Sequence, residues 1–581
     1  MSESTDAGTG ALLAPDRVWT VAETAAGEVS VRGRAFAGDE LLEGTALAAH
    51  FGDADSLTAF ATALDALNGF FAVVVERSDG TFVGVDHVRS IPLVYAPDAG
   101  LVSDDARRLA DRLGSGAYDS LAESELLVSG NVLGDRTLVP GMHALRPGEA
   151  VGLVDGEAER TRYAAFRPGT ADAEEVDHGA ALDRLERAVD AAFDRLSAVV
   201  GDRKVALALS GGADSRLVAT ELAARDHDVL TYSFGTAGNE DVRVAREVAA
   251  ALDLPWEFVA YSTDSWGEWY VSPERAAFVD RAFSYDSIPN YGTVPALSEL
   301  RDRGVLVDDA VCSSGQTVAG VSENVPTAFE KPSPDTDDVV DAVLEYWARW
   351  GWENPAFDRA VRERIAAAVA DGGEPAADGS AGEIDSFPAA FAAFERWKHD
   401  ERHTKYFVAD ARQYDFFGLD WWLPLWDREV VAAWAAVPVA DRRRKRAYVD
   451  LVDRRFAART GLERDAATAL AIETDAPTFA GRLLDAAAER VVDSPVAPYL
   501  RGIYWRFQRA RSDYGDHPLG WYGIVPPELF ARLYSGREDV HALQALEAVG
   551  RASFVESTVT DPPRDGVLSL PYCGGGTAGE S

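Results

Sequence analysis

The segment 205–215, which reads VALALSGGADS, decides the fold of this protein. Its first five residues are all apolar, and an apolar run without polar alternation is typical of a strand buried on both faces of a parallel sheet. Two glycines follow, and a helix is expected over about 214–225. A strand, a glycine-containing turn and a helix in this order indicate an α/β unit.

The same order of elements continues after this segment. Apolar runs at 229–234 and 256–259 predict two further strands, and the periodicity of 241–252 predicts the helix between them. An amphipathic helix is expected before the first strand, over 176–199. One face of that helix collects Leu182, Leu185, Val189, Ala192, Phe193 and Leu196. We therefore expect a doubly wound parallel sheet.

The loop 210–215 has the composition of an anion site. Its two glycines let backbone N–H groups approach an anion with no Cβ in the way. The helix behind the loop adds free N–H groups and the positive end of its dipole. Ser210 and Ser215 supply hydroxyl donors, and Asp214 is placed to hold a divalent cation against phosphate oxygens. Together these groups predict a pyrophosphate site.

Two other phosphate-binding patterns are excluded. The chain contains no G-x-x-x-x-G-K-[ST] loop, and the loop at 210–215 lacks the third glycine of a dinucleotide fingerprint. The alternative to a phosphate site is an ordinary tight turn between a strand and a helix.

The residues before the parallel sheet have a different pattern. Residues 18–166 indicate a β-rich domain, with short apolar runs such as 70–75 and 82–85 separated by turn residues. Helices are expected near 54–67 and 104–113.

The remaining chain is expected to be mostly helical. A polar linker is predicted at 167–175, a helix at 336–350 and a Gly-, Ala- and Asp-rich loop at 370–384. Residues 386–460 have a helical pattern rich in tryptophan and arginine, and helices are also expected after residue 461. The last ~20 residues are expected to be disordered.

Composition excludes several classes of function. The 581 residues include 96 acidic and 56 basic side chains, which give a net charge of −40, and only five lysines. Such a charge argues against tight binding to nucleic acid. It is typical of a salt-adapted protein, with an ordinary acidic protein as the alternative. Two cysteines, neither in a Cys-x-x-Cys pattern, indicate no zinc site or disulfide framework. No signal peptide or membrane span is recognised, so a cytoplasmic protein is expected.

These motifs resemble those of a known family. The loop matches the S-G-G-x-D-S signature of the ATP pyrophosphatase group, and residues 20–460 resemble asparagine synthase of the glutamine-hydrolysing type, in a salt-adapted, haloarchaeal form. The further stretches that carry the resemblance are Tyr232-Ser233-Phe234-Gly235, Asn239-Glu240-Asp241, Trp422-Leu423-Pro424-Leu425-Trp426-Asp427 and Lys445 with Tyr448, and, in the N-terminal part, Leu67-Asn68-Gly69-Phe70-Phe71-Ala72, Asp86-x2-Arg89-Ser90-Ile91-Pro92 and Gly141-x3-Leu145-x-Pro147-Gly148.

The resemblance implies a fold and a domain order. It implies an N-terminal domain of the αββα type found in N-terminal nucleophile hydrolases, over 1–170. An ATP-pyrophosphatase α/β domain with a parallel sheet and a helical C-terminal part would follow over 176–460, with an insertion at about 330–385. Residues 461–581 would form a helical extension with a disordered tail.

The resemblance also implies an activity and its residues. ATP with Mg²⁺ would activate a carboxylate as an acyl-adenylate, which ammonia or another amine then converts to an amide; aspartate to asparagine is the default reaction. Lys445 and Asp214 would be catalytic, and Asp214 would also hold the metal. The implied ATP site consists of Leu209, Ser210, Gly211, Gly212, Asp214, Ser215, Ser233, Phe234, Gly235, Ser314, Gly315 and Gln316.

The sequence departs from the family pattern in two places. Residue 2 is Ser2 and no cysteine precedes Cys312, so the glutaminase domain lacks a thiolate nucleophile and is expected to be inactive. In the second phosphate motif, Gln316 replaces a carboxylate that would share Mg²⁺. Asp308 and Asp309 are candidates to compensate, with a turn between strands as the other interpretation.

Other interpretations stay open at this stage. The chain is alternatively a ligase acting on a sugar acid or another metabolite, or a non-catalytic nucleotide-binding descendant. The amine donor, the acceptor and a homodimeric state are not decided by the sequence. A metal site at His403, Lys405 and Asp410 is disfavoured, and the four tryptophans at 421, 422, 426 and 434 are expected in the core.

Overall fold

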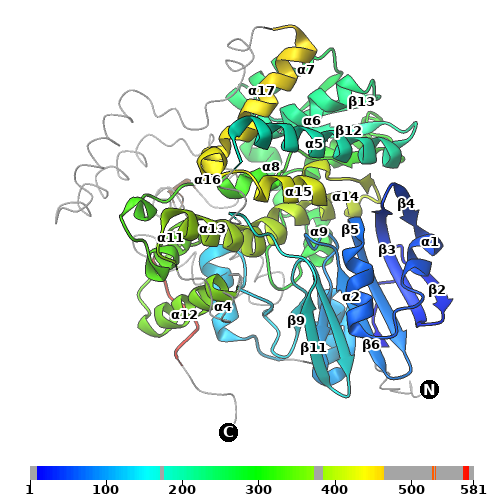
Figure 1. Cartoon of the computed structure of the whole chain (residues 1–581), viewed down its shortest axis with the longest axis vertical. Helices are drawn as coiled ribbons and strands as arrows, with labels where there is room; N and C mark the ends of the chain where they lie inside the picture. Colours follow the sequence, from blue (N-terminus) through cyan, green and yellow to red (C-terminus); the bar gives the residue numbers. More distant parts are fainter. Residues whose placement is uncertain are drawn as a thin grey trace.

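The structure of the chain is a computed structural model. The structure describes residues 10–114, 116–169, 176–371, 384–462, 527–528, 530 and 567–574. Figure 1 shows the N-terminal β-sheets at the lower right, the parallel sheet with its helices at the top, and a group of helices at the lower left.

A seven-stranded antiparallel sheet organises the N-terminal region. Its strands are β2 (Thr20–Thr24), β3 (Gly27–Ala37), β4 (Glu40–Glu43), β5 (Leu67–Arg77), β6 (Gly80–Val85), β10 (Glu149–Val154) and β11 (Glu157–Arg162). They are ordered β11-β10-β6-β5-β3-β2, with β4 paired to β3. The predicted apolar runs 70–75 and 82–85 lie in the two central strands, β5 and β6, because a central strand is buried on both of its faces.

Alternate residues of β5 pack into two different layers. Phe71, Val73 and Val75 contact α1 (Gly44–His50) and α2 (Leu57–Asp65). The intervening side chains belong to the core shared with a four-stranded sheet. That sheet consists of β1 (Gly10–Ala11), β8 (Leu101–Ser103), β7 (Val94–Ala96) and β9 (His143–Ala144).

Helix α3 (Ala106–Leu113) packs on the far side of the four-stranded sheet and completes four layers: helices, sheet, sheet, helix. Helices α2 and α3 confirm the two helices predicted near 54–67 and 104–113. Helix α1 was not predicted, because its seven residues are too few to show a clear periodicity.

The parallel sheet has the predicted doubly wound topology. Its strands are β12 (Val205–Ala208), β13 (Val229–Gly235), β14 (Trp256–Ala260), β15 (Val311–Ser313) and β17 (Asp420–Trp421), in the order β14-β13-β12-β15-β17. All adjacent pairs are parallel. Its helices include α5 (His178–Val200), α6 (Ala213–Ala224) and α7 (Glu240–Ala251), which confirm the three helices predicted around the first strands.

The chain changes direction in this sheet between β12 and β15. From β12 it proceeds outward to β13 and β14, and it then returns to the other side of β12 to form β15. In an open α/β sheet, the carboxyl ends of the strands on either side of such a switch point enclose a crevice where ligands bind.

A third group of helices packs around its own apolar core. It contains α11 (Thr336–Trp347), α12 (Pro355–Asp371), α13 (Phe387–Lys398) and the N-terminal helix α4 (Ser120–Ser129). Helix α11 confirms the helix predicted at 336–350, whereas α12 was not anticipated. Most of the predicted loop 370–384, part of the linker 167–175, and most of the extension 461–581 lie outside the described residues.

A short C-terminal segment joins this helical group. Strand β18 (Val567–Leu568) pairs with β16 (Gly351–Trp352), and Tyr572 donates its backbone N–H to Ser124 Oγ at 3.2 Å. The expectation that the last ~20 residues are disordered is therefore wrong for 567–574, because this segment pairs with a strand far away in the sequence, and local composition does not report such a pairing.

The two sheet regions are joined by a buried ion pair. Arg89, after β6, lies 2.7 Å from Asp286, and both side chains are almost completely buried. Burial alone would raise the pKa of Asp286, but the charges of Arg89 and Lys405 and a hydrogen bond from Ser284 lower it to about 2. Both loops of the contact contain a residue with positive φ, Arg89 itself and Tyr285 beside Asp286.

Backbone hydrogen bonds reinforce the same junction. Val132 donates to the carbonyl of Asp286 at 2.7 Å, and Leu138 donates to that of Tyr285 at 2.9 Å. The N-terminal region is therefore bound directly to the segment that connects strands β14 and β15 of the parallel sheet.

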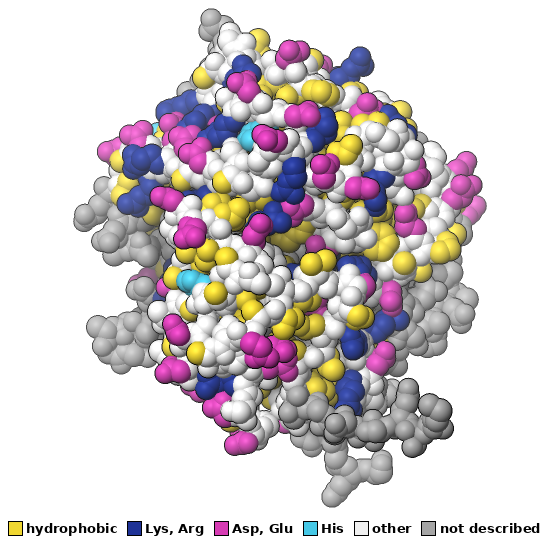
Figure 2. All heavy atoms as spheres, turned by 90° about the vertical axis from the view of Figure 1, so that its right-hand side faces the viewer, with side chains coloured by type: hydrophobic (Ala, Val, Ile, Leu, Met, Phe, Trp, Pro, Cys, Tyr) yellow, Lys and Arg dark blue, Asp and Glu magenta, His cyan; other side chains and the backbone are white. Residues whose placement is uncertain are grey.

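The surface mixes charges of both signs. On the face shown in Figure 2, Asp and Glu side chains are interspersed with Lys and Arg, and no continuous basic stripe runs across it. In the part of the chain that the structure describes, no helix combines the length and the apolarity needed to cross a bilayer.

We expect the variant Arg89→Met to lose roughly 3–5 kcal/mol of unfolding free energy, because it leaves Asp286 buried without its main counter-charge. Urea unfolding measures this loss. The double variant Arg89→Met/Asp286→Leu should recover much of it. Arg362→Met, which removes an exposed ion pair with Asp341, is the matched control and should cost about 1 kcal/mol or less. Equal losses in both single variants would contradict the assigned role of the junction.

Candidate functional site

The predicted loop lies at the switch point of the parallel sheet. Leu209 and Ser210 follow β12, Gly235 ends β13, and Ser314 follows β15. Because these strands are parallel neighbours, their carboxyl ends meet at one edge of the sheet. The fold thus brings together the two segments that the sequence analysis selected for binding phosphates.

The loop 210–215 is held by its own hydrogen bonds. Ser215 Oγ accepts from the backbone N–H of Ser210 at 3.0 Å and lies 3.0 Å from Ser210 Oγ. Gly212 is the N-cap of α6, and no side chain caps this end. The first N–H groups of a 12-residue helix therefore remain for an anion, together with the positive end of its dipole.

The end of β13 contributes backbone rather than side chains. Ser233 Oγ donates to the carbonyl of Leu209 at 2.6 Å and accepts from Trp256 Nε1 at 2.9 Å, so this hydroxyl fixes two strands together. Phe234 packs against Tyr261 with ring centroids 5.5 Å apart. Gly235 has φ 130°, and the space that its Cβ would occupy is open. These features leave a flat backbone ledge beside the loop.

The second segment touches the first. A Cβ on Gly315 would lie 2.3 Å from the backbone nitrogen of Ser215, so only glycine permits this approach. Ser314 is 9% exposed, and its Oγ is buried without a hydrogen-bond partner among the described residues, as is that of Ser313. Buried hydroxyls without partners are rare, and they point to a ligand that supplies the missing hydrogen bonds.

Gln316 is bonded to a carboxylate that the sequence analysis had not assigned to this site. Its Nε2 donates to Asp410 Oδ2, which also accepts from Asn290 Nδ2 at 3.2 Å. Burial raises the pKa of Asp410 to about 7, against the lowering effect of these two hydrogen bonds. Gln316 Oε1 and Asp410 Oδ1 have no hydrogen-bond partner in the part of the chain that the structure describes. A carboxyl group that titrates near neutral pH thus lies one side chain behind the position where the family has its own carboxylate.

The disfavoured metal site grouped His403 and Lys405 with Asp410, but both of these side chains contact other residues. Lys405 Nζ binds Glu401 at 2.7 Å, and the His403 ring lies against Gly320. Asp308, a candidate to compensate for Gln316, pairs with Arg301 and is 85% exposed. In the described parts of the chain, no group of three or more His, Cys, Asp or Glu side chains forms a ready-made metal centre.

Lys445 reaches the loop from the opposite side. Its Nζ lies 3.4 Å from Asp214 Oδ1 and 3.8 Å from Glu323 Oε1, and its side chain is 12% exposed. Burial raises the pKa of Asp214, and the charge of Lys445 opposes that shift. Glu323 was missed in the sequence because it follows a 3₁₀ turn, η3 (Val318–Ser322), and no motif marks it.

The turn that carries Lys445 is strained and anchored. Arg444 and Lys445 both have left-handed backbone angles, φ 54° and 57°, which cost energy for residues other than glycine. Just before them, the fully buried Arg442 pairs with Glu395 at 3.0 Å. Glu395 also accepts from Ser322 at the end of η3. One buried network therefore fixes the lysine and the turn carrying the second phosphate segment.

A second lysine lies behind the same turn. Lys398 is fully buried, and its Nζ donates to Asn324 Oδ1 at 3.0 Å and to the carbonyl of Gly320 at 3.4 Å. The Tyr346 ring covers it at 4.5 Å. Burial lowers the pKa of Lys398 to about 7, although the charge of Glu323 opposes this.

The tryptophans and the inner cysteine are core residues, as expected. Trp421, Trp422, Trp426 and Trp434 are at most 9% exposed, and Cys312 is buried in β15. Burial raises the pKa of the Cys312 thiol far above its usual range, which makes this thiol a poor nucleophile.

Gly315→Ala should weaken nucleotide binding by at least tenfold, because the added Cβ displaces the backbone of Ser215 and with it the start of α6. Isothermal titration with ATP measures the effect. Gly116→Ala, where the added Cβ meets no atom within 4 Å, is the matched control. If the two variants bind ATP equally well, then the two segments do not form one site.

Lys398 should make stability depend on pH in a defined direction. The pKa of Lys398 in the folded protein, about 7, lies below the ordinary lysine pKa of 10.5, so the unfolded chain binds more protons between these values. The free energy of unfolding should therefore rise between about pH 7 and 10 through this group. In Lys398→Met that contribution disappears, and denaturant titrations at pH 7 and 9.5 measure the difference. An unchanged pH slope would show that Lys398 titrates normally.

Comparison with known proteins supports one family. The family model for asparagine synthase matches residues 182–294, which include the loop 210–215 and the strand that ends at Gly235. The match does not extend to the segment around Ser314 or to Lys445. A search of curated proteins found no match.

Similar solved structures were also found. An NH3-dependent NAD synthetase from Campylobacter jejuni is 16% identical, with 35% of this chain and 98% of that chain covered and a TM-score of 0.20. Glutamine phosphoribosylpyrophosphate amidotransferase from B. subtilis is 11% identical, with 50% and 62% covered and a TM-score of 0.15. A structure of the allosteric regulatory enzyme of purine biosynthesis is 12% identical, with 52% and 56% covered and a TM-score of 0.16. The chain thus spans less than two thirds of the last two proteins, and all three TM-scores are too low to establish a shared fold. The family-model match identifies residues 182–294 as a segment of the asparagine synthase type.

Proposed function

We propose that this protein is an ATP-dependent, AMP-forming amide ligase of the asparagine synthase type. The observation that carries the proposal is the meeting of two glycine-containing segments at the switch point of a parallel sheet, with Lys445 3.4 Å from Asp214 of the first segment. The match over residues 182–294 supports the same activity.

The phosphates of ATP would lie on the N-terminus of α6. The uncapped N–H groups there and the buried hydroxyls of Ser313 and Ser314 supply donors that the protein itself leaves unused. The backbone ledge at Gly235 leaves room for the adenine. The site residues proposed from the sequence thus divide into phosphate donors from the loop and the second segment, and a nucleoside ledge from β13.

Mg²⁺ fits the acidic groups around Lys445. Asp214 and Glu323 both approach its Nζ, and each keeps part of its carboxylate exposed. Mg²⁺ prefers few protein carboxylates, with phosphate oxygens and water completing its shell. When bound, the metal would neutralise charge on the phosphates. Glu323 would then supply the second carboxylate that Gln316 does not.

The chemistry would proceed in two steps. A carboxylate oxygen of the acceptor attacks the α-phosphorus of ATP, and the bond to the β-phosphate oxygen breaks, so that pyrophosphate leaves. Lys445 and the α6 N–H groups stabilise the charge that develops on the leaving group. An amine nitrogen then attacks the acyl carbon and loses a proton, and AMP leaves.

Asp410, which lies beside Gln316, is the group best suited to accept a proton from the amine. Its pKa of about 7 lets it exchange a proton near neutral pH, and its Oδ1 has no partner. Aspartate to asparagine is the default reaction. A sugar acid or another metabolite as acceptor is the alternative within the same chemistry.

The N-terminal region is proposed to be a glutaminase-like domain without glutaminase activity. Its four layers support the αββα fold of N-terminal nucleophile hydrolases. The first cysteine in the sequence is Cys312, which is buried in the parallel sheet. Free ammonia, another amine or a partner protein would then supply the nitrogen. We further propose that the protein is cytoplasmic and salt-adapted, and that it binds neither nucleic acid nor membranes.

A non-catalytic nucleotide-binding descendant remains the second candidate, because Gln316 replaces a carboxylate of the family motif. Gln316→Glu separates the two candidates. A large gain in pyrophosphate release would indicate a degenerate site, and a loss would indicate that the Gln316–Asp410 pair serves a working one.

The test of the proposed function is ATP–pyrophosphate exchange at high KCl with aspartate and a panel of other carboxylates. Exchange that depends on one carboxylate is expected. Lys445→Met should lower the exchange rate by about 10²–10³, the usual effect of removing a group that stabilises transition-state charge. Lys204→Met, at the opposite end of β12 and paired with Asp228 at the surface, should leave it unchanged. An exchange rate in Lys445→Met equal to that of the unmodified protein would refute the assignment.

A further inference from the structure

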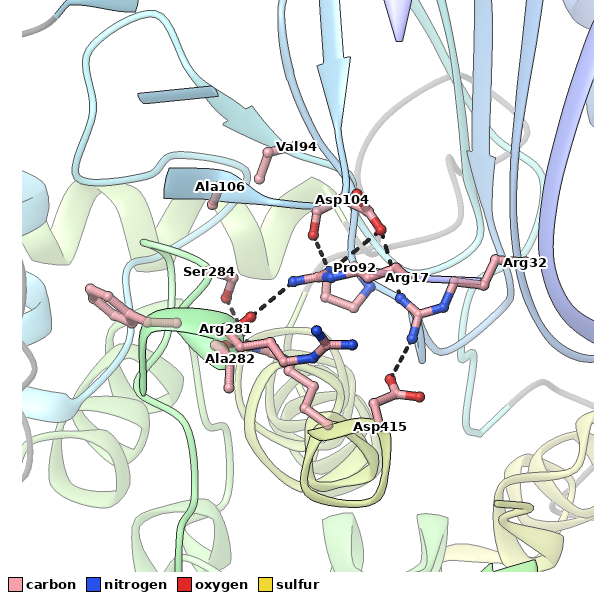
Figure 3. Close-up of a pocket in the computed structure, with 12 residues that line it drawn as sticks. Arg17, Arg32, Pro92, Val94, Asp104, Ala106, Arg281, Ala282, Ser284 and Asp415 are labelled. Atoms are coloured by element: carbon pink, nitrogen blue, oxygen red, sulfur yellow. Dashed lines mark hydrogen bonds and ion pairs between the residues drawn. The ribbon is translucent and has the colours of Figure 1, made fainter. Parts of the chain in front are cut away.

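A small cavity lined by several charged residues lies where the N-terminal sheets meet the helices of the parallel-sheet region. It is lined by four arginines and two aspartates among its twelve residues. Figure 3 shows Arg17 and Arg32 approaching it from the N-terminal region, with Arg281 on the opposite wall. In a chain with a net charge of −40, a cavity where guanidinium groups outnumber carboxylates is unusual.

The carboxylates of the cavity are already shared. Asp104 lies 3.6 Å from Arg17 and 3.7 Å from Arg32, and it also accepts hydrogen bonds from Trp19 Nε1 and the backbone of Ala14. Asp415 lies 2.8 Å from Arg32. Arg281 turns to Asp16, which does not line the cavity.

The fourth arginine, Arg412, has no carboxylate of its own. Among the described residues, no carboxylate lies within 4.0 Å of the Arg412 guanidinium. The guanidinium donates through Nη1 to the carbonyl of Ala282 and to Ser284 Oγ, which lies 3.2 Å away. Its Nε is buried without a partner, and the whole residue is 9% exposed. The charge of Asp286 reaches Arg412 only through Ser284 and is shared with Arg89, so the buried cation is incompletely compensated, which costs free energy.

Arg412 cannot escape this cost by losing its proton. Burial is the main cause that lowers the pKa of Arg412 to about 10, with the charges of Arg89 and Arg17 adding to it and that of Asp286 opposing it. At neutral pH the group therefore stays charged. An anion in the cavity would supply the missing counter-charge and an acceptor for Nε.

The size of the cavity limits the anion. Its volume is about 30 Å³. A cavity of roughly 10–15 Å³ by this measure holds one water. The space therefore suits one monatomic ion and excludes a nucleotide or a sugar phosphate. A halide also accepts hydrogen bonds from several directions, as guanidinium groups on opposite walls require.

We propose that this cavity binds a single small monovalent inorganic anion of the chloride type, which compensates the charge of Arg412 and fastens the N-terminal region to helix α14 (Ala411–Phe416). The site is independent of the proposed ligase chemistry. It rests on the cavity, on the unshared arginine and on the excess of positive charge around it.

The test is thermal unfolding of the full chain at constant ionic strength while chloride replaces gluconate. We expect a saturable rise of the midpoint with chloride, and with bromide in its place. Arg412→Met should lose the saturable part. Asp415→Asn removes a competing negative charge and should shift half-saturation to at least threefold lower chloride. Arg243→Met, which breaks exposed ion pairs on α7, should respond as the unmodified protein does.

A crystal of the unmodified protein grown in bromide tests the site without any substitution that could impair folding. An anomalous peak in the cavity beside Arg412 is expected. Water in its place would overturn the proposal, as would a chloride response that is identical in the unmodified protein and in Arg412→Met.

Discussion

The contact between Gly315 and Ser215 is the constraint on which the candidate site depends. It places the second phosphate segment directly on the first, because strands β12 and β15 are parallel neighbours and no side chain separates the loops that follow them. Every other proposed group is defined relative to this contact: Lys445 faces Asp214 one residue before it, and Gln316 follows it. A site built on backbone contact between two strands is rigid, as preorganised electrostatic catalysis requires.

Much of the fold could be predicted from the sequence, because the elements that form it are long or strongly patterned. The run 205–209 identified β12, and the helix at 178–200 was expected within two residues. The candidate site was harder to predict from the sequence. Its loop and Lys445 follow family motifs, whereas Glu323 and Asp410 reach the site only through tertiary folding. Asp410 follows a π-helical segment, η5 (His399–Phe407), which shifts the helical register so that spacing in the sequence misplaces it.

Buried charges recur wherever two parts of the molecule meet. Arg89 with Asp286 joins the sheet regions, and Arg442 with Glu395 anchors the turn before Lys445. Such pairs contribute little net stability, since desolvation offsets most of the attraction. They do, however, penalise any arrangement in which one partner is left alone. These buried pairs therefore favour a single relative placement of the parts of the protein while adding little stability. A site assembled from distant segments needs such a fixed placement.

The pairing of β18 with β16 has a consequence for how the chain is made. Tyr572 contacts Ser124 across 448 positions of sequence, and residues 567–574 complete the core of α4 and α12. During synthesis, domains usually fold in order from the N-terminus. Here the helical group stays incomplete until residue 574 has been released from the ribosome. The packing that Leu570 and Tyr572 add to this core is thus absent until synthesis is nearly complete, whereas the N-terminal sheets can close much earlier.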